Sequence, residues 1–135
     1  MTGGGDQRHT IFAEGFGRKM TDEAEALGES RGEAFGPLQA KWTLDLPYGE
    51  LWTREEQLPR KLRSFTVLGI LIGLRQPEEI KAHVRMGLAN GLTRQEFEEI
   101  FYSAVFYGGF PIANTAKHAI LEAFAEIEAE GRTIP

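Results

Sequence analysis

The sequence contains no cysteine among its 135 residues. This absence excludes disulfide bonds, thiolate nucleophiles, thiol redox chemistry and zinc sites built on cysteine. Any catalysis must therefore depend on histidine, carboxylates, tyrosine and arginine. Histidine is itself scarce, with three residues in the chain.

A surplus of positive charge is also lacking, because 15 Lys and Arg stand against 20 Asp and Glu. The two signs are interspersed, so nucleic acid is not expected as a partner. The longest apolar run, residues 65–74, is about half of the roughly 20 residues that span a bilayer, so it indicates a buried helix and no membrane partner. No signal-peptide pattern begins the sequence, so we expect a cytoplasmic location.

The remaining composition is that of an ordinary globular domain, with 41% hydrophobic and 26% charged residues. The first ten residues are polar and rich in glycine, and residues 1–20 are expected to form a flexible N-terminal arm. Residues 21–135 are expected to form a single domain. A helix is expected to begin at Thr21, although Gly28, Gly32, Gly36 and Pro37 interrupt the helical pattern after it.

Helical periodicity recurs along the rest of the chain, and no alternating strand pattern appears. A short helix is expected between Pro37 and Leu46. The next helix carries a stripe of Leu58, Leu62, Phe65, Gly69 and Ile72. It is apolar on nearly every side, so we expect it to be central, with Gly69 and Gly73 allowing a neighbouring helix to approach closely.

Three further helices have clear start and stop signals. The signals are Pro77 and Asn90-Gly91 for the first, Thr93 with Glu96 and then Gly108-Gly109 for the second, and Pro111 for the third. Proline favours a first helical turn, Thr93 and Glu96 form a capping-box pattern, and glycine favours helix ends. The predicted fold is therefore all-α.

These segments resemble the carboxymuconolactone decarboxylase family, whose helical fold is shared with AhpD-type alkylhydroperoxide reductases. The resemblance covers about residues 36–128. The matching pieces are GELWT at 49–53, LPR at 58–60 with RS at 63–64, HVR at 83–85, NGLT at 90–93, and YGGFP at 107–111 continuing to Asn114. Five pieces in this order make the resemblance specific.

The same resemblance separates two branches of the family. Redox-active members carry a Cys-x-x-Cys pair four residues before a histidine, and the positions counted back from His83 hold Gln76 and Glu79. Their proton-relay glutamate falls near Ser64 here. Peroxidase and disulfide-reductase activities are therefore excluded. The sequence is similar instead to the decarboxylase branch, which converts 4-carboxymuconolactone to 3-oxoadipate enol-lactone in the beta-ketoadipate pathway without a metal or organic cofactor.

His83 and Glu50 are the predicted catalytic residues. This reaction produces a dienolate that must be protonated, and an unperturbed histidine with a pKa of about 6.5 delivers protons near neutral pH. Glu50 lies between apolar neighbours, so we expect it to be partly buried and to orient His83 or act as a second acid or base. The simpler alternatives are an ordinary helix-edge histidine and a helix-start acid favoured by the backbone dipole.

Six further residues are predicted to bind the substrate: Arg60, Arg63, Arg85, Trp52, Tyr107 and His118. The arginines are suited to holding a carboxylate or the developing enolate oxygen. Trp52, with Phe110, is suited to an apolar wall that excludes water. Tyr107 and His118 match positions that recur in decarboxylase-like members.

These binding residues also have alternatives. Arg60 and Arg63 could simply pair with surface glutamates. Arg85 lies two residues from His83 and so on roughly the opposite side of a helix, which favours a subunit contact. Gln76, Glu79 and His83 share a helix face, but one histidine and one carboxylate make a poor site, so we expect no metal.

The sequence thus predicts a cofactor-independent decarboxylase of 4-carboxymuconolactone or a related lactone or aromatic-derived acid. Phe101, Phe106, Phe110 and Phe124 exceed what a small core needs, so a homo-oligomer is expected, and the resemblance implies a trimer or hexamer. Two alternatives remain open. The same scaffold could act on another substrate in a biosynthetic or catabolic pathway, or the protein could be a non-catalytic oligomeric binding protein.

Overall fold

The computed structural model describes residues 35, 36 and 38–135, and every regular element among them is helical. They contain five α-helices and one short π-helix, with no strand in this part of the chain. The predicted all-α fold is confirmed. The arm predicted over residues 1–20 and the helix predicted to begin at Thr21 lie outside the described residues.

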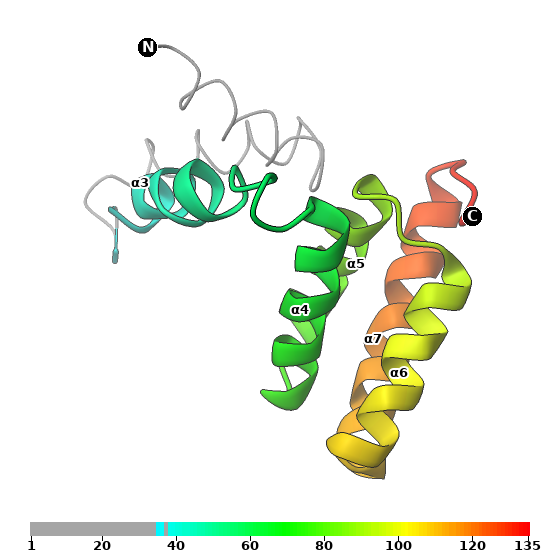
Figure 1. Cartoon of the computed structure of the whole chain (residues 1–135). Helices are drawn as coiled ribbons and strands as arrows, with labels where there is room; N and C mark the ends of the chain where they lie inside the picture. Colours follow the sequence, from blue (N-terminus) through cyan, green and yellow to red (C-terminus); the bar gives the residue numbers. More distant parts are fainter. Residues whose placement is uncertain (1–34, 37) are drawn as a thin grey trace. The chain divides into compact units, whose positions relative to one another are not determined.

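The chain divides into two compact units, residues 1–59 and 60–135. In the described part of the first unit, α3 spans Leu38–Asp45 and the π-helix η1 spans Pro47–Leu51 (Figure 1). The short helix predicted between Pro37 and Leu46 is therefore present. The prediction of a single domain over residues 21–135 stays a prediction.

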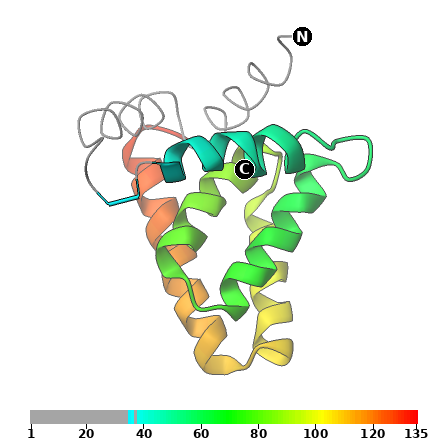
Figure 2. The same ribbon diagram turned by 90° about the vertical axis from the view of Figure 1, so that its left-hand side faces the viewer.

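The second unit consists of four helices: α4 (Arg60–Gly73), α5 (Pro77–Ala89), α6 (Arg94–Tyr107) and α7 (Phe110–Ala129). The long α7 packs against α5 and α6, and α4 contacts the other three helices, as Figures 1 and 2 show. None of the described helices combines the length and the apolar character that crossing a bilayer demands.

The core of the second unit draws on all four helices. Its buried members are Leu68, Ile72, Ile80, Val84, Leu92, Phe97, Ile100, Ala116, Ala119, Ile120, Ala123, Phe124 and Ile127. The rings of Phe97 and Phe124 meet edge to face, with their centroids 5.4 Å apart, a geometry that aromatic pairs favour. Ile134 also packs against this core.

The predicted helix ends of the second unit are confirmed. Pro77 lies in the first turn of α5, and Asn90 caps its C-terminus. The Thr93 hydroxyl accepts a hydrogen bond from the Glu96 amide at 3.2 Å, while the Glu96 carboxylate accepts one from the Thr93 amide at 3.0 Å. Gly91 and Gly109 have φ angles of 96° and 104°, a conformation that favours glycine at such breaks.

The predicted buried face of α4 is partly wrong. Its buried residues are Ser64, Leu68 and Ile72, whereas Leu62 and Gly69 of the predicted stripe are exposed. A Cβ atom built on Gly69 or Gly73 meets no atom of the described residues within 4 Å, so the predicted close approach does not occur there.

Close packing occurs instead at Gly87 of α5. A Cβ atom there would lie 3.1 Å from Cζ of Phe97 and 3.3 Å from Cδ2 of Leu92. Both neighbours are almost fully buried. The glycine that allows close packing is therefore on α5, and not on α4 as predicted.

Candidate active site

His83 lies on the buried face of α5 and exposes 8% of its surface. Burial removes water from the ring and lowers its pKa to about 4, because the charged imidazolium loses most by desolvation. The ring is thus neutral at pH 7. The unperturbed pKa assumed for His83 from the sequence is therefore not the pKa of this buried ring, and the predicted role of His83 as a general acid stays a prediction.

A buried hydrogen bond connects α4 to the C-terminal end of α5. The side-chain amide of Asn90 donates to the hydroxyl oxygen of Ser64 at 2.9 Å. Ser64 exposes almost no surface, so the bond satisfies a polar group within the core. Sequence reasoning noted Ser64 only as a departure from the redox-active branch. The signal for this pair was the spacing of Ser64, which lies four residues before Leu68 and eight before Ile72 and so on the helix face that these apolar residues bury.

Arg60 and Arg63 stand one turn apart at the start of α4, and both are half-buried. Nε of Arg63 is buried and has no hydrogen-bond partner among the described residues. An anionic oxygen would supply the missing acceptor, because a guanidinium group only donates. This geometry fits the predicted role in holding a carboxylate, which stays a prediction.

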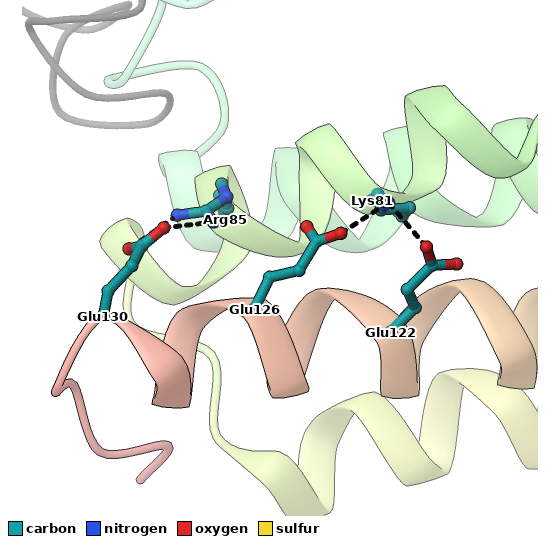
Figure 3. Close-up of polar contacts among 5 residues, drawn as sticks. All are labelled: Lys81, Arg85, Glu122, Glu126 and Glu130. Atoms are coloured by element: carbon teal, nitrogen blue, oxygen red, sulfur yellow. Dashed lines mark hydrogen bonds and ion pairs between the residues drawn. The ribbon is translucent and has the colours of Figure 1, made fainter.

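The other side of α5 carries a row of ion pairs with α7, shown in Figure 3. Lys81 Nζ lies 3.1 Å from a carboxylate oxygen of Glu122 and 2.8 Å from one of Glu126. The guanidinium of Arg85 donates to both carboxylate oxygens of Glu130, at 2.6 and 3.1 Å. We call these five residues the α5–α7 ion-pair row.

The hydrogen bonds of this row shift the pKa values of Lys81, Arg85 and Glu130. Bonds to Glu126 and Glu122 raise the pKa of Lys81, and those to Glu130 raise the pKa of Arg85. Sequence reasoning missed the row, although Lys81 and Arg85 are four residues apart, as are successive glutamates of α7. Arg85 is thus held within its own chain, and its substrate or subunit role stays a prediction.

Tyr107 and His118 are both exposed. Tyr107, at the end of α6, exposes 97% of its surface and borders a groove of about 330 Å³ between α4 and α6. His118 lies on α7 with its side chain toward solvent. Their predicted roles stay predictions. No group of three or more His, Asp or Glu side chains gathers as metal ligands in the part of the chain that the structure describes.

Glu50 and Trp52 belong to the first unit. Tyr48 and Trp52 are buried, and their rings stack with centroids 6.2 Å apart. Glu50 lies between them in the sequence, within the π-helix, and is exposed. The expected partial burial of Glu50 is therefore wrong, because the local turn buries the two aromatic side chains on either side of it. The roles predicted for Glu50 and Trp52 stay predictions.

Comparison with known proteins places the predicted site residues in one matched segment. Residues 37–122 match the family model described as "Carboxymuconolactone decarboxylase family". This range runs from before α3 into α7 and includes every predicted site residue.

Two curated relatives are similar to parts of the chain. A 4-carboxymuconolactone decarboxylase of Acinetobacter baylyi is 34% identical over 80 residues, which are 59% of this chain and 59% of the relative. A nitrosuccinic acid decarboxylase of Metarhizium robertsii is 38% identical over 64 residues, 47% of this chain and 44% of the relative. The chain thus spans about half the length of the relatives it matches.

Proposed function

Because the chain belongs to the carboxymuconolactone decarboxylase family, we propose that it is a cofactor-independent decarboxylase of a small lactone or related acid. The names of both relatives, each a decarboxylase, support this proposal. The observation that carries it is His83, a buried and neutral ring on α5 in the matched segment. The arginine-bearing α4 packs directly against α5.

The first substrate we propose is 4-carboxymuconolactone. When the bond between the ring carbon and its carboxylate breaks, CO2 leaves and the bonding electrons move through the ring double bond to the lactone carbonyl oxygen. The dienolate that results takes a proton on carbon. This chemistry needs a cation near the oxygen or a retained carboxylate, and an acid near the carbon. Arg60 and Arg63 supply the cation.

His83 gains its proton when the anionic substrate binds. A carboxylate beside the ring favours the imidazolium form and raises the pKa of His83 from about 4. The proton comes from solvent, passes from the imidazolium to the dienolate carbon, and is replaced from solvent after turnover. Burial strengthens the attraction between the ring and the substrate anion. Glu50 remains the second catalytic candidate.

A second substrate class is a nitro acid, which the similarity to a nitrosuccinic acid decarboxylase favours. Loss of CO2 from a carbon that bears a nitro group leaves electrons that delocalise onto the nitro oxygens. The carbon again needs a proton, and the oxygens again need a cation. The same histidine and arginines would therefore serve both substrates.

We further propose that the protein acts as a homo-oligomer, as a trimer or hexamer. Large apolar side chains are exposed on the second unit, among them Leu62, Ile70, Leu74, Phe106, Tyr107 and Phe110. Such a set is typical of a surface that another subunit covers. Light scattering coupled to size-exclusion chromatography measures the subunit number, and a monomer at micromolar concentration would contradict the proposal.

The decisive experiment measures CO2 release and enol-lactone formation from 4-carboxymuconolactone in the presence of a metal chelator. Loss of a general acid typically costs roughly 10²- to 10⁴-fold in rate, so His83→Gln should lower kcat by that amount. Arg63→Gln should raise KM for the anionic substrate. Arg132→Gln, which changes an exposed arginine near the C-terminus, is the control and should keep wild-type turnover.

The contrasting outcomes separate the alternatives. Turnover of nitrosuccinate but not of the lactone would retain the reaction and change the substrate. Full activity in His83→Gln would remove His83 from the mechanism. Failure of the wild type on both acids would favour the non-catalytic binding protein.

A further inference from the structure

A hollow of about 250 Å³ lies between α6 and α7 of the second unit. Its floor is apolar, because Phe97, Ile120 and Phe124 are buried core residues. Phe101, Tyr102 and Leu121 also line it. None of the lining residues belongs to the predicted active site.

Two cations stand at this hollow. The guanidinium of Arg94 lies 5.2 Å from the ring centroid of Phe124, and Nζ of Lys117 lies 5.8 Å from that of Phe101. Among the described residues, neither cation forms an ion pair, whereas Lys61, Lys81 and Arg85 each contact a carboxylate within 4 Å. Both charges are therefore held over aromatic faces and remain available to an anion.

We propose that this hollow binds a small aromatic carboxylate. The ring would rest on the phenylalanine floor, where edge-to-face contacts are favourable, and the carboxylate would accept hydrogen bonds from Arg94 and Lys117. The volume lies below the roughly 300 Å³ at which drug-sized pockets begin, so a single-ring acid fits better than a long-chain acid. Inorganic phosphate would gain nothing from the apolar floor.

Glu98 allows a test in which removing a charge should raise, and not lower, the affinity for the acid. It lines the same hollow, and its carboxylate repels a bound anion. Removing that charge should strengthen binding, whereas removing either cation should weaken it. A purely hydrophobic site would show neither effect.

The probe is 4-fluorobenzoate, titrated into the full-length protein and followed by fluorine NMR, with uncharged 4-fluorobenzamide as the matched ligand. We expect saturable binding of the acid with a Kd of about 1 mM or tighter and much weaker binding of the amide. Arg94→Gln and Lys117→Gln should each raise the Kd about tenfold, the usual effect of losing a charge-assisted hydrogen bond. Glu98→Gln should lower it.

Two controls locate the binding. Arg132→Gln should leave the Kd unchanged, because Arg132 does not line the hollow. His83→Gln should also bind normally, which separates this site from the proposed active site. Circular dichroism verifies that the variants at the exposed residues Arg94, Glu98 and Lys117 retain the fold.

The proposal is overturned by equal affinity for the acid and the amide, or by an unchanged Kd in both Arg94→Gln and Lys117→Gln. Loss of binding in His83→Gln alone would place the acid elsewhere and would equally overturn it. Absence of any saturable binding would show that the hollow is not a ligand site.

Discussion

His83 couples the stability of the protein to pH. Its pKa is about 4 in the fold, against an ordinary value of 6.5, so the unfolded chain binds this proton more readily. The neutral His83 ring therefore makes its full contribution to the free energy of unfolding above pH 6.5, and this contribution is lost as the pH falls toward 4. Relative to His83→Gln, the wild type should lose about 3 kcal/mol of unfolding free energy between pH 7 and pH 4.

Denaturant titrations of both proteins across this pH range measure the difference. The His83→Gln variant keeps the carboxylates, which also titrate in acid. Subtracting its unfolding free energy from that of the wild type at each pH therefore leaves the effect of the imidazole alone. Parallel curves would contradict the assigned burial of the ring.

Gly87 and Gly69 form a matched pair for measuring how tightly the second unit is packed. Alanine at either position gains about 1 kcal/mol of helix propensity. At Gly87 the added methyl would lie 3.1 Å from the buried ring of Phe97, whereas at Gly69 it meets no described atom within 4 Å. We expect Gly69→Ala to stabilise the protein and Gly87→Ala to be less stable than Gly69→Ala by about 1 to 3 kcal/mol.

Thermal unfolding of the two variants tests this expectation. If they unfolded at the same temperature, Phe97 and Leu92 would have to shift at little cost, and the core would be looser than the contacts indicate.

His83 and Glu50 show which features of the site could be predicted from the sequence and which could not. His83 was identifiable because the HVR piece matched the family pattern. Its lowered pKa was not, because desolvation depends on the helices that pack around the ring. Glu50 shows the same limit, since its exposure depends on a π-helix whose turn the local sequence did not predict.

Among the helices, the ends were predictable from the sequence and the buried faces were less so. Pro77, the Thr93–Glu96 box and Gly109 act through their own backbone neighbours, so their signals survive without tertiary context. The stretch around α4 is apolar on most sides, and periodicity could not identify the buried face. The polar Ser64 proved to be buried because Asn90 provides its hydrogen bond.

The α5–α7 ion-pair row is expected to stabilise the protein only modestly. Glu126→Gln removes one of the two carboxylates at Lys81, and ion pairs near the surface contribute little to stability because water and salt screen them. We expect a small loss of unfolding free energy at low salt and a smaller loss at high salt, where exposed charges are screened.

The matched control is Glu128→Gln, because Glu128 is exposed on the same helix and forms no ion pair among the described residues. Chemical denaturation at two salt concentrations compares the two variants. An effect of Glu126→Gln that is independent of salt would indicate packing rather than charge.

For the molecule as a whole, the described hydrophobic cluster lies within residues 60–135. Every described member of it, including the packed Ile134, comes from this unit. We expect residues 60–135 alone to be helical by circular dichroism and to unfold cooperatively. A fragment that is unfolded at neutral pH would show that residues 1–59 supply essential stabilisation.

The tail after α7 has a consequence for measuring local opening. The Arg94 amide donates to the backbone oxygen of Pro135 at 2.7 Å, although the first amides of a helix lack an acceptor within the helix. In hydrogen–deuterium exchange, this amide should therefore carry protection that its position alone would not give. The exchange rate of the Arg94 amide therefore measures how often the tail detaches while the rest of α6 stays folded.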